Sequence, residues 1–114
     1  MNQIADVVDY ELKRFGLNVV RNSPSQSLQE VVAESNAVNP KVHVAIHSNA
    51  SANGTARGPE VYTHRFGGDG ERLARDIYTN LEEISPVDGF GVKEGYTAFT
   101  VSYTHLKYQA FYHP

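Results

Sequence analysis

Two histidines at a spacing of four are the first candidates for chemistry in this chain. His43 and His47 have the spacing that two zinc ligands use on one face of a helix. The segment Lys41–Ile46 (KVHVAI), however, is rich in β-branched residues and predicts a strand. On a strand, residues four apart share a face but lie about 13 Å from each other, too far for both imidazoles to bind one zinc ion. At most one of the two is a ligand of a given site.

His47 is the better candidate because it lies at the carboxyl end of the predicted strand. In open α/β sheets, ligands bind in the crevice beyond those ends. A structural role is the alternative for His47, and it is the favoured role for His43, part-way along the strand. Nothing in the sequence places His105 or His113 near His47. The chain has no cysteine, which excludes thiolate metal sites, disulfides and cysteine nucleophiles.

Two helices are predicted before this strand. Over Met1–Phe15, apolar residues recur at spacings of three and four, and Gly16 follows as a left-handed stop. Ser27 begins a capping box that predicts a second helix. That helix ends before Pro40, which favours extended geometry at Asn39.

A third helix is predicted over Glu71–Ile84, after the glycine-rich turn Gly67–Gly70. Such a turn before a helix can cradle a phosphate, but a simpler role for Asp69 is that of the helix N-cap. The acidic residues of this helix are predicted to form a solvated face: Asp76, Glu82 and Glu83.

Leu17–Arg21 and Pro59–His64 are further predicted strands, so that helices and strands alternate along the chain. This order is typical of α/β layer proteins and not of a sandwich or a bundle. The chain of 114 residues is one small domain or part of a larger one.

Charge and hydropathy exclude two classes of partner. The 10 Lys and Arg residues do not outnumber the 13 Asp and Glu residues, so nucleic acid is not an expected partner. No apolar run approaches the roughly 18 residues of a membrane span. Charges spread through residues 1–20 do not have the layout of a signal peptide.

The residues around His47 resemble a known enzyme family. His47–Ala50 (HSNA) and Ala56–Tyr62 (ARGPEVY) resemble the H-x-N-A and A-R-G-x-E-x-Y motifs of the zinc-dependent N-acetylmuramoyl-L-alanine amidases of the Amidase_3 family. The resemblance runs to about Lys93 and includes three further parts: the helix ending in Gly16, Leu28–Ala37 and Gly91–Lys93.

This resemblance implies a three-layer α/β fold, with a mostly parallel sheet between helices and one zinc ion at the carboxyl ends of strands. In the family, zinc is held by a His in an early D-P-G-H-G loop, a Glu heading the next helix and the His of H-x-N-A, and a late Glu is the general base. Zinc would polarise the amide between the muramyl lactyl group and L-alanine and acidify its bound water, and the Glu would pass the proton to the leaving amine. The implied substrate is peptidoglycan, and the implied location is extracellular or associated with the cell wall.

Among the family's four functional positions only His47 has a match, so it is the implied zinc ligand and no catalytic residue is assigned. Asn49, Arg57 and Glu60 are expected to support the site. Asn49 would hold the loop after His47 through hydrogen bonds from its side chain to the backbone, with contact to substrate as the alternative. Arg57 and Glu60 would pair with each other or orient the site. The helix that the family's Glu ligand heads is already under way at Met1. Either the chain starts inside a longer protein or the domain has lost its site; the missing helix cap favours truncation.

We therefore expect residues 1–100 to be a partial, inactive amidase catalytic domain and residues 101–114 to be an off-family tail. Within that tail, Val101–Leu106 (VSYTHL) resembles a translated sequencing-library adapter, and an amphipathic strand is the alternative. Two other interpretations stay open: a non-catalytic cell-wall-binding or interaction module on the same scaffold, and an unrelated α/β domain with a chance H-S-N-A.

Overall fold

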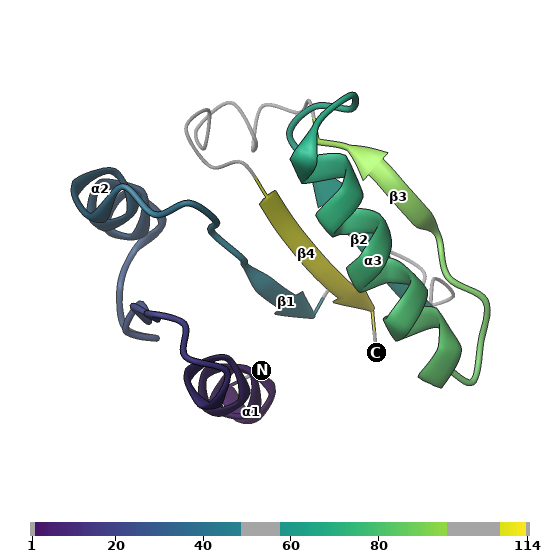
Figure 1. The fold of residues 1–114 in the computed structure, drawn as a ribbon, viewed down its shortest axis with the longest axis horizontal. Helices are drawn as coiled ribbons and strands as arrows, with labels where there is room; N and C mark the ends of the chain where they lie inside the picture. The colour runs from purple at the N-terminus through teal and green to yellow at the C-terminus, as the bar shows by residue number, and fades with distance from the viewer. Residues whose placement is uncertain (1, 49–57, 96–107, 114) are drawn as a thin grey trace. The chain divides into compact units, whose positions relative to one another are not determined.

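A computed structural model describes residues 2–48, 58–95 and 108–113 of the chain (Figure 1). The chain divides into two compact units, Met1–Asn39 and Pro40–Pro114. The first, which we call the helical unit, contains two described helices. The second, which we call the sheet unit, contains a mixed sheet of four strands and one helix. This composition confirms the predicted α/β class.

The helical unit consists of α1 (Asn2–Arg14) and α2 (Leu28–Val38), close to the predicted bounds. Gly16 ends α1 with a φ of +86°, the left-handed geometry that glycine adopts without a steric penalty. Ser27 is the N-cap of α2, because its side-chain oxygen accepts the Glu30 N–H at 3.2 Å. The predicted stop and the predicted capping box are therefore confirmed.

Two predictions in the helical unit are wrong. Asn39 is not extended: it has φ 52° and ψ 57°, and its N–H donates to the Ser35 carbonyl at 2.9 Å. Asparagine tolerates this left-handed geometry, which satisfies a carbonyl at the end of α2. Leu17–Arg21 is not a strand, since a strand needs a hydrogen-bonded neighbour and the described part of this unit contains only helices.

In the sheet unit the strands are β1 (Ile46–Ser48), β2 (Gly58–Thr63), β3 (Gly91–Glu94) and β4 (Tyr108–His113). Their spatial order is β1-β4-β2-β3, so the last strand of the chain lies between the first two (Figure 1). The pairs β1–β4 and β2–β3 are parallel, whereas β2–β4 is antiparallel. Two of the three pairings thus have the predicted parallel sense.

Strand β1 is shorter and later than predicted. Residues 41–45 are irregular, and regular pairing begins at Ile46, opposite Ala110 of β4. His43 therefore lies before the strand and not part-way along it. The apolar composition of KVHVAI is typical of strands, but only the residues that reach a partner strand form one.

Helix α3 (Asp69–Ile84) packs on β2 and β3 and forms the core of the sheet unit. Val61 of β2 and Ala74 of α3 are buried at its centre. Partly buried apolar side chains surround them: Ile77, Tyr78, Leu81 and Val92. This packing holds β2 and the start of β3 in place for the site described next.

Candidate functional site

His47, the predicted zinc ligand, lies in β1, one residue before the end of that strand. Its register partner in β4 is Phe111, and the register partner of Phe111 in β2 is Glu60. Three neighbouring strands thus place His47, Phe111 and Glu60 at one level of the sheet. Two other predicted support residues, Asn49 and Arg57, lie outside the described residues.

His113 lies nearer to His47 than the sequence indicated. It is in β4, two residues beyond the register partner of His47 and opposite Gly58 of β2. Because β1 and β4 are parallel, their carboxyl ends meet at one edge of the sheet. The sequence carries no sign of this placement, since it depends on pairing between distant segments. His105 lies outside the described residues.

Glu60 is a buried carboxylate with a defined partner. Its side chain is 7% exposed, and its Oε2 lies 3.1 Å from Lys93 Nζ. Burying a carboxylate is costly unless an opposite charge and hydrogen bonds compensate. The ion pair with Lys93 therefore supports the buried position of Glu60 at the start of β2. The expected pair of Glu60 with Arg57 lies outside the described residues.

Tyr62 belongs to the same face of β2 and also contacts Glu60. Burial and a hydrogen bond to the Glu60 carboxylate raise the pKa of the Tyr62 hydroxyl to about 12. Tyr62 is the register partner of Lys93, whose Nζ lies 6.0 Å from the Tyr62 ring centroid. Burial and charge thus keep the Tyr62 hydroxyl protonated as a hydrogen-bond donor.

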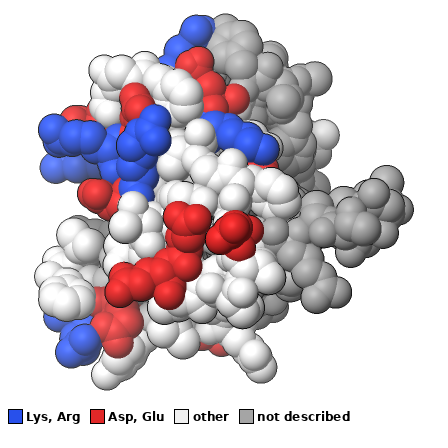
Figure 2. Space-filling model, turned by 90° about the vertical axis from the view of Figure 1, so that its right-hand side faces the viewer, with Lys and Arg blue, Asp and Glu red and all other residues white. Residues whose placement is uncertain are grey.

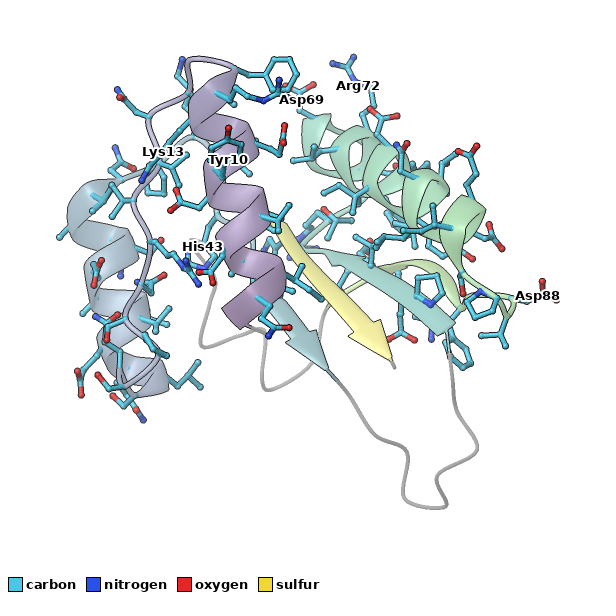
Figure 3. All side chains as sticks on the ribbon, turned by 90° about the horizontal axis from the view of Figure 1, so that it is seen from below. Tyr10, Lys13, His43, Asp69, Arg72 and Asp88 are labelled. Carbon is cyan, nitrogen blue, oxygen red and sulfur yellow. The ribbon has the colours of Figure 1, made fainter. Side chains whose placement is uncertain are left out.

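The segment before β3 packs tightly on the start of β2. A Cβ at Gly89 would lie 2.6 Å from the Tyr78 hydroxyl and 2.7 Å from the Pro59 carbonyl. A Cβ at Gly58 would collide with the Asp88 carbonyl; Asp88 is labelled in Figure 3. The Phe90 N–H donates to the Pro59 carbonyl at 2.8 Å. These contacts hold Phe90 next to β2, where its ring centroid is 5.5 Å from Lys93 Nζ.

The family of the chain follows from a comparison with family models. The Amidase_3 model, described as N-acetylmuramoyl-L-alanine amidase, matches residues 1–109. The chain belongs to the Amidase_3 family. Members of this family are peptidoglycan amidases, which are hydrolases, and the resemblance drawn from H-S-N-A and A-R-G-P-E-V-Y is confirmed. Neither the curated proteins nor the solved structures contain a significant match.

The match to the Amidase_3 model extends beyond Lys93 and ends within β4. The predicted domain boundary at residue 100 lies in the range 96–107, which is outside the described residues. The boundary and the origin of residues 101–106 stay predictions. None of the described helices is long and apolar enough to cross a membrane.

The zinc ion of Amidase_3 enzymes needs a set of ligands that the described residues do not supply. Among them, no group of three or more His, Cys, Asp or Glu side chains could hold a metal ion. Glu60, the buried acid nearest in register to His47, is paired with Lys93. Because a zinc site takes about three protein ligands, the described donor set does not fit a complete zinc centre.

The glycine-rich turn before α3 does not have the predicted arrangement. Gly68, and not Asp69, is the N-cap of α3, and no side chain caps it. Instead Glu71 accepts the Gly67 N–H at 2.9 Å and pairs with Arg75 at 2.6 Å. The Gly67 N–H and the Arg75 guanidinium lower the pKa of the Glu71 carboxyl. The Glu71 carboxylate therefore places a negative charge beside the start of α3, which disfavours binding of an anion there.

The acidic residues later in α3 are solvated, as the sequence predicts. Asp76, Glu82 and Glu83 are all exposed, and Figure 2 shows acidic side chains gathered on one face of the molecule. Sequence reasoning missed a different group, the contacts that join Glu60, Tyr62 and Phe90 to Lys93. Neither A-R-G-P-E-V-Y nor the later G-V-K carries a signal for these contacts, because they depend on the register between β2 and β3.

Proposed function

We propose that this chain is a fragment of a zinc-dependent N-acetylmuramoyl-L-alanine amidase. The reaction is hydrolysis of the amide between the muramyl lactyl group and L-alanine of peptidoglycan, at the cell wall or outside the cell. The observation that carries the proposal is the family match over residues 1–109, with His47 of H-S-N-A near the end of β1. In this proposal His47 is a zinc ligand, and Asn49, Arg57 and Glu60 support the site.

We further propose that these 114 residues alone do not hydrolyse peptidoglycan. His47 is the one residue that matches the ligand and general-base positions of the family. The described residues contain no group of three metal-binding side chains. A zinc hydrolase needs about three protein ligands and an open position for water, so an incomplete set would bind the ion weakly.

A calorimetric titration of the 114-residue chain with zinc tests the second proposal. We expect no tight one-to-one binding, and His47→Ala should leave the titration nearly unchanged. A submicromolar site that disappears in His47→Ala would show that the chain holds zinc tightly and would contradict the proposal.

The amidase itself is tested by supplying the missing groups. A family member's D-P-G-H-G loop and helix-leading Glu are joined before Asn2, and its general-base strand replaces residues 101–114. We expect this protein to clear suspensions of purified cell walls in the presence of zinc, and His47→Ala in the same protein to abolish clearing. If a folded protein of this kind binds zinc but releases no L-alanine amino groups, the proposed reaction is wrong.

The described residues lack a full set of zinc ligands, and this also favours a second candidate, a non-catalytic module that binds the cell wall or another partner on the amidase scaffold. Sedimentation of the unaltered chain with cell walls, in the presence of a chelator, separates the two. Strong zinc-independent binding, together with no lysis by the restored protein, would support the module.

A further inference from the structure

The sheet unit contains two Asp–Gly dipeptides in different surroundings. Asp69–Gly70 lies in the first turn of α3, whereas Asp88–Gly89 lies between the end of α3 and the start of β3. Both aspartates are labelled in Figure 3. An aspartate followed by glycine is prone to rearrange to isoaspartate, because glycine has no side chain that blocks access to its nitrogen. The same reaction can therefore be compared at two places in one chain.

The rearrangement needs no reagent other than water. The glycine nitrogen attacks the Cγ atom of the aspartate side chain, the N–Cγ bond forms, and the N–H proton leaves with the Cγ hydroxyl as water. Water then opens the resulting succinimide ring. Opening at the main-chain carbonyl frees the α-carboxyl group and joins the chain through Cβ and Cγ, which is isoaspartate. The mass is unchanged, but the main chain is one atom longer.

Both reacting groups of Asp88–Gly89 are available. Asp88 is exposed, and its carboxylate makes no ion pair or hydrogen bond with any described residue. The Gly89 N–H likewise donates to no acceptor among the described residues, whereas the next N–H, that of Phe90, donates to the Pro59 carbonyl at 2.8 Å. Neither reacting group therefore has to leave a partner before the ring forms.

Asp69–Gly70 is restrained by its position in α3. The Asp69 carboxylate lies 3.1 Å from the Arg72 guanidinium, although both side chains are 82% exposed and such a pair is weak. The helical backbone is the stronger restraint. Ring closure needs a rotation about the Asp69 Cα–C bond, and this rotation breaks the first turn of the helix.

The packing around Gly89 both requires the glycine and makes the product unfavourable. A Cβ at this position would lie 2.6 Å from the Tyr78 hydroxyl and 2.7 Å from the Pro59 carbonyl, so the fold places glycine directly after an exposed aspartate. In the product, the Asp88 carbonyl that packs on Gly58 would become a free carboxylate. The longer main chain would also move the next N–H away from the Pro59 carbonyl.

We propose that Asp88–Gly89 is a site of spontaneous isoaspartate formation, and that isoaspartate at this site loosens the contact between the start of β2 and the start of β3. The inference goes beyond the proposed function, because it requires neither zinc nor peptidoglycan. Its test therefore has outcomes that do not depend on whether the chain is part of an amidase.

The test is incubation of the unaltered 114-residue chain at pH 6 and 37 °C, followed by peptide mapping that measures isoaspartate at each position. We expect isoaspartate to form about tenfold faster at Asp88 than at Asp69, because Asp69 must first leave its helical turn. In concentrated urea the two rates should become nearly equal, since the surrounding structure is lost. Mapping by position separates these products from those of Asn53–Gly54, which lies outside the described residues.

Asp88→Glu is the matched control variant. It keeps the negative charge, but its longer side chain would have to close a larger ring, which forms far more slowly. Hydrogen exchange at the Phe90 amide should become faster after incubation of the unaltered chain, because the bond to the Pro59 carbonyl is lost. Exchange at this amide should not change after incubation of Asp88→Glu, and exchange in α1 and α2 should not change in either protein.

Two results would overturn the proposal, and both come from the unaltered chain, so neither depends on how a variant folds. If the folded chain forms no isoaspartate at Asp88, or forms it at Asp69 at an equal or higher rate, Asp88–Gly89 is not the proposed site. If a purified fraction with isoaspartate at Asp88 shows unchanged exchange at the Phe90 amide, the proposed loosening of β2 and β3 is wrong.

Discussion

Burial separates the helical unit from the sheet unit. In the helical unit Ser35 is the one described residue that is buried, whereas the sheet unit buries Val61, Thr63 and Ala74 where β2 meets α3. Much of the apolar surface of the helical unit is exposed, at Ile4, Val7, Tyr10, Phe15, Leu17, Val20 and Val38. Its described stabilising contacts include caps and ion pairs close in sequence, a side-chain hydrogen bond from Gln26 to Glu34, and an ion pair between Asp6 and Arg21.

This difference teaches which substitutions should matter in each unit. Where backbone segments and a buried charge are packed closely, the surrounding structure cannot easily adjust when a single group is added or removed. Where contacts are local and exposed, each contributes about 1 kcal/mol or less. Substitutions matched in chemistry but placed in the two units should therefore differ in their effect on the free energy of unfolding.

The largest difference is expected between two glycines with positive φ. Gly58 has φ +110°, and an added Cβ would collide with the Asp88 carbonyl, whereas Gly16 has φ +86° and open space around it. Gly16→Ala should lower the free energy of unfolding by about 1 kcal/mol, from backbone geometry alone. Gly58→Ala should lower it by about 3 kcal/mol, because the backbone must also shift. Urea denaturation followed by circular dichroism measures both, and equal losses would contradict the comparison.

The next effect concerns ion pairs. Lys93→Met leaves the buried Glu60 carboxylate without its ammonium and should cost about 1 to 2 kcal/mol at pH 7, reduced by the partial exposure of Lys93. Lys13→Met breaks the Lys13–Asp9 pair of α1, whose lysine side chain is 57% exposed, and should cost less than about 0.5 kcal/mol.

The double variant Glu60→Gln/Lys93→Met is the control for the buried pair. It should recover part of the stability lost in Lys93→Met, because no uncompensated charge is then buried. If the double variant is less stable than Lys93→Met by the full cost of Glu60→Gln, the two residues are not coupled.

A smaller effect is expected at the start of α2. Ser27→Ala removes the side-chain oxygen that accepts the Glu30 N–H and should destabilise α2 by about 1 kcal/mol. Hydrogen exchange should become faster at α2 amides and stay unchanged in β2 and α3. The control is Gln29→Ala, an exposed position in the same turn. Faster exchange in the sheet unit would show that the two units are coupled in stability.

The smallest effect is a pH dependence at the start of α3, where the sheet unit uses a local contact. The Gly67 N–H and Arg75 lower the pKa of the Glu71 carboxyl. A lowered pKa gives stability that is present above the unfolded-state value and is lost as the pH falls through the folded-state value. Thermal denaturation is measured at pH 7, 5 and 3. The melting temperature of the unaltered chain should exceed that of Glu71→Gln at pH 7, and this difference should shrink as the pH falls to 3. Glu83→Gln, on the exposed face of α3, is the control, and an advantage that persists at pH 3 would contradict the assignment.

The ends of helices could be predicted because they depend on residues within about four positions. Gly16 and the Ser27 capping box are examples, and both appear in the structure as predicted. The same local reasoning failed at Asn39, where two local preferences compete: the residue before a proline favours extended geometry, and the end of a helix favours a left-handed residue. Asn39 adopts the left-handed geometry, in which its N–H donates to the Ser35 carbonyl.

The sequence motifs of the candidate site could be predicted, but the contacts between its residues could not. The family and the candidate ligand His47 came from short stretches, H-S-N-A and A-R-G-P-E-V-Y, which need no knowledge of contacts. The partner of Glu60 could not be predicted in this way. It is Lys93 because β2 and β3 are parallel neighbours in the register that pairs Tyr62 with Lys93.

The sequence by itself determined the family and the three helices, because each depends on residue types over short spans, and the same short spans supply His47 as a candidate zinc ligand. Only the tertiary structure decided how much of KVHVAI becomes a strand, that β4 lies between β1 and β2, and that Glu60 is paired with Lys93. The physical reason is that strands and buried charges acquire their partners from segments that are far apart in the sequence. Pairing energy between distant segments selects those partners, and no local preference encodes it.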